Sequence, residues 1–383
     1  MKKKLAVVII FIIVLVFPMV SWPIVSHFDV TLDENREKAD FPTFGDDVFA
    51  QFDKYFADRA PYRNMMIKLY NGSALTFRKA YERLLRLFNV AYYTSINDTL
   101  IGKDDWLFYT AYNSLDYYAG SNIPTQLQLR AFVDRAEKVG DYFKSQGKEF
   151  VIFIAPNKEQ IYSEYMPESI LVENQFKRMD VIANYFMEHS DVRVIYPKDE
   201  LIAAKATRNT YLMQDTHWND FGAYLGAKSV LDALQIPVSP DVTISKTLYT
   251  GGDLALIAAL DYLTYTAYDV SYRPDVTLDY LVATDDCHEY TIASSNKNGK
   301  NLFVLGDSFA LGDHNRAGMR DVLAKEFERS VFNHRDNFTK LNYTYAEEFE
   351  AADVVVFSAA EKFETSIFNL FGLLQQFIDR YNL

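Results

Sequence analysis

Apolar and polar residues alternate along most of the chain in blocks that are typical of alternating strands and helices. The apolar stretches at 149–155 and 301–305 have the length of buried strands, while the longer stretches between such blocks carry apolar residues at helical spacing. The expected helices are 126–146, 174–188, 221–234, 317–327 and 366–381, and the expected strands are 149–155, 192–196, 301–305 and 353–357. This order predicts an α/β fold in which helices cover both faces of a parallel sheet.

Three other regions depart from this alternation. Residues 26–89 are polar at first and then helical in pattern, which predicts a helical stalk or arm. Residues 101–109 have the pattern of a short turn and strand that enter the main domain, which we expect to span 90–383. Residues 244–298 are polar and show no clear period, so we expect an irregular insertion within that domain.

The N-terminal segment has the pattern of a membrane anchor. Three lysines at 2–4 precede an uncharged apolar run, Leu5 to Val25, which is about long enough to cross ~30 Å of hydrocarbon as a helix. A cleaved signal peptide is the alternative, but the run ends in FPMVSWP, at 17–23, which makes a poor cleavage site. Because lysines stay on the cytoplasmic side, we expect a single-pass anchor at 1–25 in the cell membrane and an extracytoplasmic body.

The overall composition excludes several classes of function. The formal net charge is −13, and no cluster of Lys or Arg follows the first four residues, so a nucleic-acid partner is not expected. Cys287 is the single cysteine of the chain, so neither an intrachain disulfide nor a cysteine-based zinc site can form. No glycine-rich phosphate-binding loop is present, and we expect neither a cofactor nor a metal.

The first candidate for chemistry is a serine that follows a buried strand. Residues 302–305 form a short apolar strand that runs into Gly306, Asp307 and Ser308, and a helical pattern follows. Gly306 permits a tight turn that places Ser308 at the carboxyl end of the strand, where its backbone N–H can donate to a developing oxyanion. The alternative is a strand-to-helix turn in which Asp307 and Ser308 only cap backbone groups.

The second candidate is a histidine with a carboxylate two residues before it. Asp215, His217 and Trp218 stand just before the helix expected at 221–234. A serine hydroxyl needs a base, and a nearby carboxylate can fix the tautomer of that base and stabilise the imidazolium. Alone, the segment could equally be a helix cap, but together with Ser308 it supplies nucleophile, base and orienter.

Other polar residues are weaker candidates for a functional role. Asn157 and Lys158 follow the strand at 149–155, so Asn157 could donate to an oxyanion, and Lys158 could hold an anionic sugar or order the loop; an ordinary turn is the alternative. Trp218 is a third possible contact for substrate. Asp313-His314 is a possible substitute base, while Asp285-Asp286-Cys287-His288 resembles a metal cluster but is expected to be a solvated loop, since adjacent residues converge poorly on one ion.

Taken together, these motifs resemble the alginate O-acetyltransferase group of SGNH-hydrolase-like proteins, the AlgJ/AlgX and DHHW families. The likeness covers nearly the whole chain after the anchor, because short matches occur in the expected order. These matches are Glu34-Asn35-Arg36, Phe41-Pro42, Asp58-Arg59-Ala60-Pro61-Tyr62-Arg63, Gly102-Lys103-Asp104-Asp105-Trp106-Leu107-Phe108, Pro156-Asn157-Lys158, Asp215-Thr216-His217-Trp218, Gly252-Asp253-Leu254 and Gly306-Asp307-Ser308-Phe309. One departure is Lys362 after Glu361, where relatives often carry arginine.

The resemblance implies an SGNH-hydrolase-like parallel sheet flanked by helices, with Ser308 as nucleophile, His217 as general base and Asp215 as its orienter. It also implies an acetyl-Ser308 intermediate that passes its acetyl group to a hydroxyl of an exopolysaccharide or cell-wall glycan. The implied partner is a multispanning membrane-bound O-acyltransferase that supplies acetyl groups across the bilayer.

Two other functions are compatible with the same residues. A carbohydrate acetyl esterase would use the same three side chains with water as acceptor, and the difference lies in water exclusion and acceptor binding. A non-catalytic glycan-binding or assembly protein would leave Ser308 unreactive toward serine-directed inhibitors.

Overall fold

The computed structural model describes residues 39–41, 51, 54–55, 94–96, 98–313, 316, 318–338, 346–366, 368–369 and 371. The expected anchor at 1–25 and nearly all of the expected arm at 26–89 lie outside these residues. None of the described helices combines the length and the hydrophobicity that crossing a membrane requires.

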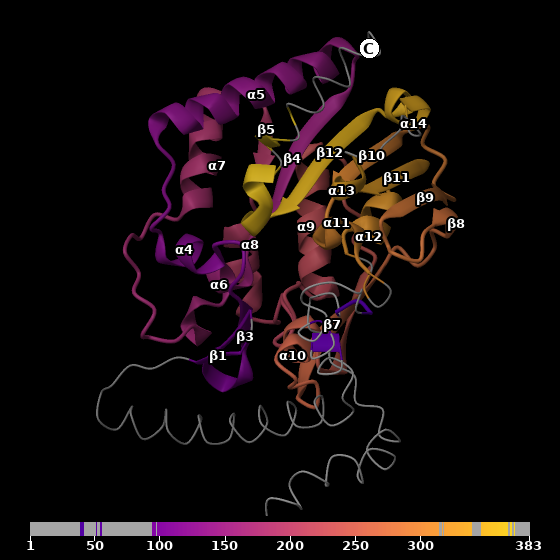
Figure 1. The fold of residues 1–383 in the computed structure, drawn as a ribbon. Coiled ribbons are helices and arrows are strands. Elements are labelled where there is room, and N and C mark those ends of the chain that lie inside the picture. The colour runs from indigo at the N-terminus through magenta and orange to yellow at the C-terminus, as the bar shows by residue number, and fades with distance from the viewer. Residues whose placement is uncertain are drawn as a thin grey trace, which may run out of the picture.

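A seven-stranded sheet forms the centre of the molecule (Figure 1), in the order β5-β4-β12-β10-β11-β9-β8. The strands are β1 (Thr94–Ile96), β2 (Thr99–Ile101), β3 (Leu107–Tyr109), β4 (Glu149–Ala155), β5 (Arg193–Ile195), β6 (Val242–Thr250), β7 (Thr264–Tyr272), β8 (Leu278–Ala283), β9 (Glu289–Ser294), β10 (Asn301–Gly306), β11 (Arg329–His334) and β12 (Val354–Ala360). From β5 to β11 all neighbours are parallel, whereas β9 pairs antiparallel with both β11 and β8. The sheet is therefore mixed, and the prediction of a wholly parallel sheet was wrong at this edge.

Helices pack against both faces of the sheet. The described helices are α4 (Ser114–Ala119), α5 (Gln126–Ser145), α6 (Lys158–Ile161), α7 (Arg178–His189), α8 (Lys198–Lys205), α9 (Asp220–Ala233), α10 (Asp253–Ile257), α11 (Ser308–Leu311), α12 (Arg320–Ala324), α13 (Arg335–Phe338) and α14 (Ala346–Ala351), with 3-10 turns at Lys103–Asp105, Ser163–Tyr165 and Glu361–Phe363. Alternate residues of β4 divide between two apolar clusters. Val151 and Phe153 pack with α8, α9 and α12, while Ile152 and Ile154 pack with α5, α7 and α14.

The sequence located the central elements well. The helix expected at 126–146 is α5, whose first turn is fixed by a capping box between Thr125 and Gln128. The strand at 149–155 is β4, and the helix at 221–234 is α9 within one residue at each end. The helix expected at 317–327 is reduced to α12, and most of the one expected at 366–381 lies outside the described residues.

The prediction of an irregular insertion at 244–298 was wrong, because this segment is regular. It holds most of the hairpin β6–β7, the helix α10, and the hairpin β8–β9 that extends the main sheet. Exposed and partly exposed residues alternate along β6. Its threonines and its one tyrosine favour a strand, but a strand with little apolar burial lacks the hydrophobic alternation on which prediction from sequence depends. The turn between β8 and β9 contains Asp285-Asp286-Cys287-His288, and Cys287 is buried there rather than solvated.

Three chain segments meet at the carboxyl-end edge of the parallel strands. β4 leads into Asn157 and α6, β10 leads into Asp307 and α11, and β12 leads into Glu361. Because these strands are neighbours and parallel, the three segments lie at one edge of the sheet, where ligands bind in open α/β sheets.

Gly222 allows helix α9 to begin close to the chain that precedes it. A Cβ at Gly222 would lie 2.1 Å from the carbonyl oxygen of Thr210 and 2.8 Å from Cβ of Trp218.

We expect Gly222→Ala to lower the free energy of unfolding by about 2 kcal/mol or more. Alanine favours helices, but the backbone atoms of Thr210 cannot move away from the added Cβ. Thermal or denaturant unfolding measures the change. Gly140→Ala in α5 is the control, since its Cβ would meet only the side chains of Val192 and Phe150; equal stability of the two variants would contradict the prediction.

Candidate active site

Ser308 stands at the start of α11, directly after β10. Its neighbour Asp307 caps the turn, because one carboxylate oxygen accepts from the backbone N–H of Phe309 at 3.1 Å and the other from that of Ala360 at 2.7 Å. Asp307 thus joins the end of β10 to the end of β12. As the first residue of a helix, Ser308 has a backbone N–H without an intrahelical acceptor, so this donor is available near its own hydroxyl.

Asp215 and His217 lie in a tight loop that precedes α9. An isolated antiparallel bridge between Tyr211 and Trp218 closes the loop, and the backbone N–H of Leu212 donates to the carbonyl of His217 at 3.1 Å. The chain then enters α9, where the side chain of Asn219 accepts from the N–H of Gly222 at 3.0 Å. The cap and the bridge together explain why this loop has one defined shape.

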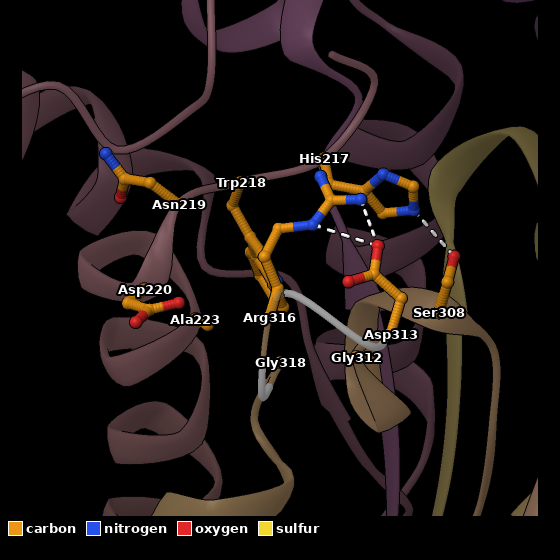
Figure 2. A pocket seen from close by; sticks show the side chains of 10 residues that line it. All are labelled: His217, Trp218, Asn219, Asp220, Ala223, Ser308, Gly312, Asp313, Arg316 and Gly318. Atoms are coloured by element: carbon orange, nitrogen blue, oxygen red, sulfur yellow. Dashed lines mark hydrogen bonds and ion pairs between the residues drawn. The ribbon is translucent and has the colours of Figure 1, made fainter. Parts of the chain in front are cut away.

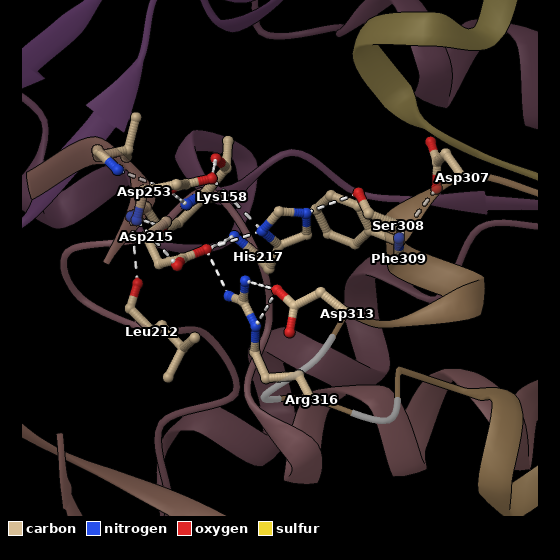
Figure 3. Close-up of polar contacts among 12 residues, drawn as sticks. Lys158, Leu212, Asp215, His217, Asp253, Asp307, Ser308, Phe309, Asp313 and Arg316 are labelled. Carbon is tan, nitrogen blue, oxygen red and sulfur yellow. Dashed lines mark hydrogen bonds and ion pairs between the residues drawn. The ribbon is translucent and has the colours of Figure 1, made fainter. Parts of the chain in front are cut away.

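The structure brings the three predicted side chains into one hydrogen-bonded row (Figure 3). His217 Nε2 lies 2.7 Å from Ser308 Oγ, and His217 Nδ1 lies 2.7 Å from Asp215 Oδ1. Because an ionised carboxylate can only accept, the proton must sit on Nδ1, which leaves Nε2 as an acceptor for the Ser308 hydroxyl. In this arrangement an imidazole can take a proton from an alcohol.

Asp215 is a buried carboxylate whose charge is compensated by its neighbours. Burial alone would raise its pKa, but the hydrogen bond with His217 and the positive charge of Arg316 hold the pKa of Asp215 well below its usual range. Arg316 Nη1 lies 2.6 Å from Asp215 Oδ1, and the backbone N–H of Asp253 donates to Oδ2 at 3.1 Å. Asp215 therefore stays ionised beside His217.

Asp253 is a second carboxylate beside His217. Its Oδ2 lies 3.5 Å from His217 Nδ1, and its Oδ1 accepts from the backbone N–H of Thr216 at 2.6 Å. Burial lowers the pKa of His217, but the hydrogen bonds with Asp215 and Asp253 outweigh it, so the pKa is raised above the ordinary value of 6.5. Gly252 permits this approach: its φ is 150°, and a Cβ there would lie 2.4 Å from the carbonyl oxygen of Gln214.

Asp215, His217 and Asp253 also satisfy one requirement of a metal site, since their ligand atoms lie within 4.8 Å of one another. The acceptor atoms, however, already have protein donors, and the guanidinium of Arg316 places a positive charge against Asp215. The chemistry of this set therefore fits a hydrogen-bonded base better than a cation ligand set.

Two cavities share Ser308 and His217. The smaller has a volume of about 10 Å³ and extends past Trp218 toward Asp313 and Arg316 (Figure 2). The larger is a groove of about 310 Å³, which we call the aromatic groove. It is lined by Tyr109, Tyr112, Thr216, His217, Asp253, Ile257, Ser308, Phe309, Lys362 and Phe363.

The remaining predicted contacts do not face the aromatic groove. Asn157 is buried, its backbone N–H donates to Glu361 at 2.9 Å, and its Oδ1 accepts from the backbone N–H of Lys362 at 3.3 Å. Lys158 is buried beneath the Asp215 loop, and burial lowers its pKa to about 7. Trp218 packs edge-on against Phe309, with ring centroids 5.1 Å apart. An oxyanion role for Asn157 stays a prediction.

The other candidates from the sequence lie apart from the His217–Ser308 pair or serve it indirectly. Asp313 pairs with Arg316, whose Nε lies 3.0 Å from it, and His314 is outside the described residues. His288 and His334 stack on each other with ring centroids 4.2 Å apart. Neither lines a cavity that contains Ser308.

Comparison with known proteins decides the family. A family model described as "SGNH hydrolase-like domain, acetyltransferase AlgX" matches residues 99–337, which is more than half of the chain and includes Ser308, His217 and Asp215. The chain belongs to this family. It is thus a member of the SGNH-type O-acetyltransferases, and the resemblance noted in the sequence is confirmed.

Individual relatives are more distant. The chain is 27% identical over 141 residues to the "Probable alginate O-acetylase AlgJ" of Pseudomonas putida, a match that covers 35% of this chain and 33% of that protein. Among solved structures, a DHHW family protein from Eubacterium siraeum has a TM-score of 0.49 at 17% identity, covering 72% of this chain and 94% of that one. The O-acetyltransferase domain of Pseudomonas putida AlgJ has a TM-score of 0.47 at 17% identity, with coverages of 69% and 91%.

Sequence reasoning missed three residues around the serine and histidine. Asp253 stands in the Gly-Asp-Leu motif that the resemblance had singled out, but no role could be given to it. The role of Arg316 could not be predicted, because its position eight residues after Ser308 does not indicate an ion pair with Asp215. Lys362 was noticed only as a departure from relatives, and the structure places it in the aromatic groove, over the ring of Tyr109 at 4.4 Å.

The two charged neighbours of His217 should shift its titration in opposite directions. Ser308 is activated only when His217 is neutral, so the reactivity of Ser308 rises with pH through the pKa of His217, which lies above 6.5. Asp253→Asn removes a group that raises this pKa and should move the rise to lower pH. Arg316→Gln removes a charge that lowers it and should move the rise to higher pH. The rate of Ser308 modification by phenylmethylsulfonyl fluoride across pH measures both, and shifts in the same direction would contradict the assignment.

Proposed function

We propose that this protein transfers acetyl groups to hydroxyls of an exopolysaccharide or cell-wall glycan through an acetyl-Ser308 intermediate. The observation that carries the proposal is the row Asp215–His217–Ser308, with both contacts at 2.7 Å, opening onto a groove large enough for a sugar. Membership of the acetyltransferase family supports the reaction class. The curated relative named as a probable alginate O-acetylase supports a polysaccharide as acceptor.

The reaction divides into two half-reactions. In the first, His217 Nε2 takes the proton of Ser308 while Oγ forms a bond to the acetyl carbonyl, and the donor's C–O bond breaks as the proton passes to the leaving oxygen. In the second, His217 takes the proton of a sugar hydroxyl, whose oxygen attacks the acetyl-serine. The Ser308 Oγ–carbon bond then breaks, and Ser308 recovers its proton.

The surroundings of Ser308 supply the other elements that this chemistry needs. The backbone N–H of Ser308, which has no intrahelical acceptor at the start of α11, is suited to the oxyanion of both tetrahedral intermediates. The ionised Asp215 stabilises the imidazolium that forms in each half-reaction. No further cofactor is required for either step.

The aromatic groove supports a sugar acceptor. Tyr109, Tyr112 and Phe363 form a contiguous wall, with ring centroids 6.2 Å apart between the two tyrosines and 4.8 Å apart between Tyr112 and Phe363. Aromatic faces with a polar tip pack against the C–H faces of sugar rings and bond to their hydroxyls. Lys362 adds a positive charge at the same wall.

Hydrolysis is the second candidate reaction. Ser308 is only half-buried, so water can reach an acetyl-serine formed on it. An acetyl esterase would then use the same three residues. The balance between the two reactions depends on whether a bound acceptor displaces water from the groove.

We further propose that the protein works outside the cytoplasmic membrane, tethered by the apolar run at 5–25. Acetyl groups would come from a membrane-bound O-acyltransferase. Tethering would raise the effective concentration of the protein near such a donor. The support for this arrangement is the sequence of the N-terminal segment alone.

Replacement of the nucleophile tests the reaction. Incubation with p-nitrophenyl acetate should add one acetyl group to Ser308, detectable by peptide mass spectrometry. Ser308→Ala should lose this adduct and lower the rate by roughly 10⁴-fold. Parallel assays of acetate release and of acetyl transfer to an oligosaccharide separate transfer from hydrolysis. A wild-type protein that forms no Ser308 adduct would contradict both reactions.

Removal of an aromatic wall residue tests the acceptor groove. Tyr112 is 58% exposed, so Tyr112→Ala should fold normally yet raise KM for an oligosaccharide acceptor about tenfold, the loss expected from one ring contact. Sulfonylation of Ser308 should stay unchanged, because Tyr112 does not touch the His217–Ser308 pair. Tyr262→Ala, at a tyrosine that is 56% exposed and does not line the groove, is the matched control. Equal KM values for the two variants would exclude Tyr112 from acceptor binding.

A further inference from the structure

Lys158 is a charged residue that the proposed reaction leaves without a role. It is the first residue of α6, directly after strand β4, and it is only 2% exposed. Its Nζ lies 5.3 Å from the ring centroid of Phe108 and 5.9 Å from that of Trp106. A lysine in such surroundings is costly unless every N–H of its ammonium group is satisfied.

The ammonium group of Lys158 is satisfied by backbone carbonyls of a single loop. Nζ donates to the carbonyl oxygens of Leu212 at 3.2 Å, Met213 at 3.2 Å and Asp215 at 2.6 Å (Figure 3). The protonated amine thus offers three donors to three acceptors, and these carbonyls favour the ammonium form that burial, which lowers the pKa of Lys158, disfavours. Within the described part of the chain, no carboxylate lies within ion-pair distance of Nζ, so the group is not half of a salt bridge.

The three carbonyls belong to the loop that carries Asp215 and His217. Tyr211 and Trp218 close this loop with a bridge, and its three carbonyls converge on Nζ of Lys158. The backbone of Asp215 is then held from one side by Lys158, while its carboxylate faces His217 on the other. A shift of the ammonium group would move the carboxylate directly.

We propose that Lys158 is a positioning residue whose ammonium group holds the Asp215–His217 loop in the shape that presents His217 to Ser308. This inference rests on the proposed function only in that the His217–Ser308 contact must matter for reactivity. If Lys158 contributed only to stability, an uncharged side chain of similar size should preserve the reactivity of Ser308 equally well. The two possibilities differ in whether an ammonium ion is needed.

Chemical rescue separates these two roles. Lys158→Ala removes the side-chain atoms from Cγ to Nζ. The n-propylammonium ion has the same three carbons and ammonium group and can fill the space that they leave. The variant, refolded in propylammonium chloride, is compared with the same variant refolded in 1-propanol or tetramethylammonium chloride. The alcohol lacks the charge, and tetramethylammonium lacks the N–H donors. The readout is the rate of Ser308 sulfonylation by phenylmethylsulfonyl fluoride, which does not depend on acetyl chemistry.

The expected result is a loss of about 100-fold in Lys158→Ala, since small misplacements of a catalytic group have effects of this size. Propylammonium should restore about tenfold of that loss, and the other two additives should restore none. Wild-type protein in propylammonium corrects for any direct effect of the amine. Equal recovery in 1-propanol, or no recovery in propylammonium, would overturn the inference.

Two further variants distinguish a loss of reactivity from a loss of folding. Lys158→Met keeps most of the volume without the charge, and it should react slowly while melting as a folded protein. Lys148→Met is the matched control, because the Lys148 ammonium also donates to two backbone carbonyls, those of Glu350 and Ala352, but at the opposite end of β4. Lys148→Met should keep the wild-type sulfonylation rate. A Lys158→Met variant that keeps it too would overturn the inference, whereas wild-type protein that is sulfonylated but transfers no acetyl would contradict the proposed function alone.

Discussion

The charge of Asp215 is the constraint around which the site is built. A buried carboxylate would normally take up a proton, and a neutral Asp215 could no longer hold His217 in the required tautomer. Three groups prevent this: the ring of His217, the guanidinium of Arg316 and the backbone N–H of Asp253. They come from three separate segments. Asp215 therefore stays ionised only if the loop before α9, the start of α10 and the loop after α11 are all in place.

The same constraint explains the unusual backbone nearby. Asp253 can reach Asp215 only because Gly252 adopts a φ of 150° against the carbonyl of Gln214. Lys158 satisfies the carbonyls that the loop turns inward, so polar groups on both sides of the chain have partners. The site is therefore a compact set of backbone and side-chain hydrogen bonds, of which the three predicted residues are the part nearest the groove.

The buried parallel strands and the residues of the catalytic row could be predicted from the sequence, whereas several other strands could not. β4 and β10 were located because continuous apolar runs bounded by glycine or a polar turn have few other interpretations. Ser308, His217 and Asp215 were found because their roles depend on residue type and on short spacing. The strands β6 and β8 were missed because mostly exposed strands lack a strong apolar period, and β11 was missed because its apolar core, Val331 and Phe332, is only two residues long.

Arg316 and Lys158 show a different limit of sequence reading. Each acts through a partner far away in the chain, on a carboxylate in one case and on carbonyls in the other. Backbone carbonyls have no signature in a sequence, so the contacts of Lys158 could be seen only in the fold. The family model adds the reaction class, but positions beyond residue 337, including Lys362, lie outside its match.

The order of strands has a consequence for how the chain assembles. β12 lies between β4 and β10 in the sheet, yet it is the last of the described strands in sequence, and its pairing with β4 joins residues such as Val354 and Glu149. During synthesis the β5–β4 pair and the strands from β10 to β8 each keep an open edge until residues 354–360 have been made. Such long-range closure is slow and leaves strand edges exposed to aggregation. A nascent chain of this protein would therefore gain from protection until β12 can insert.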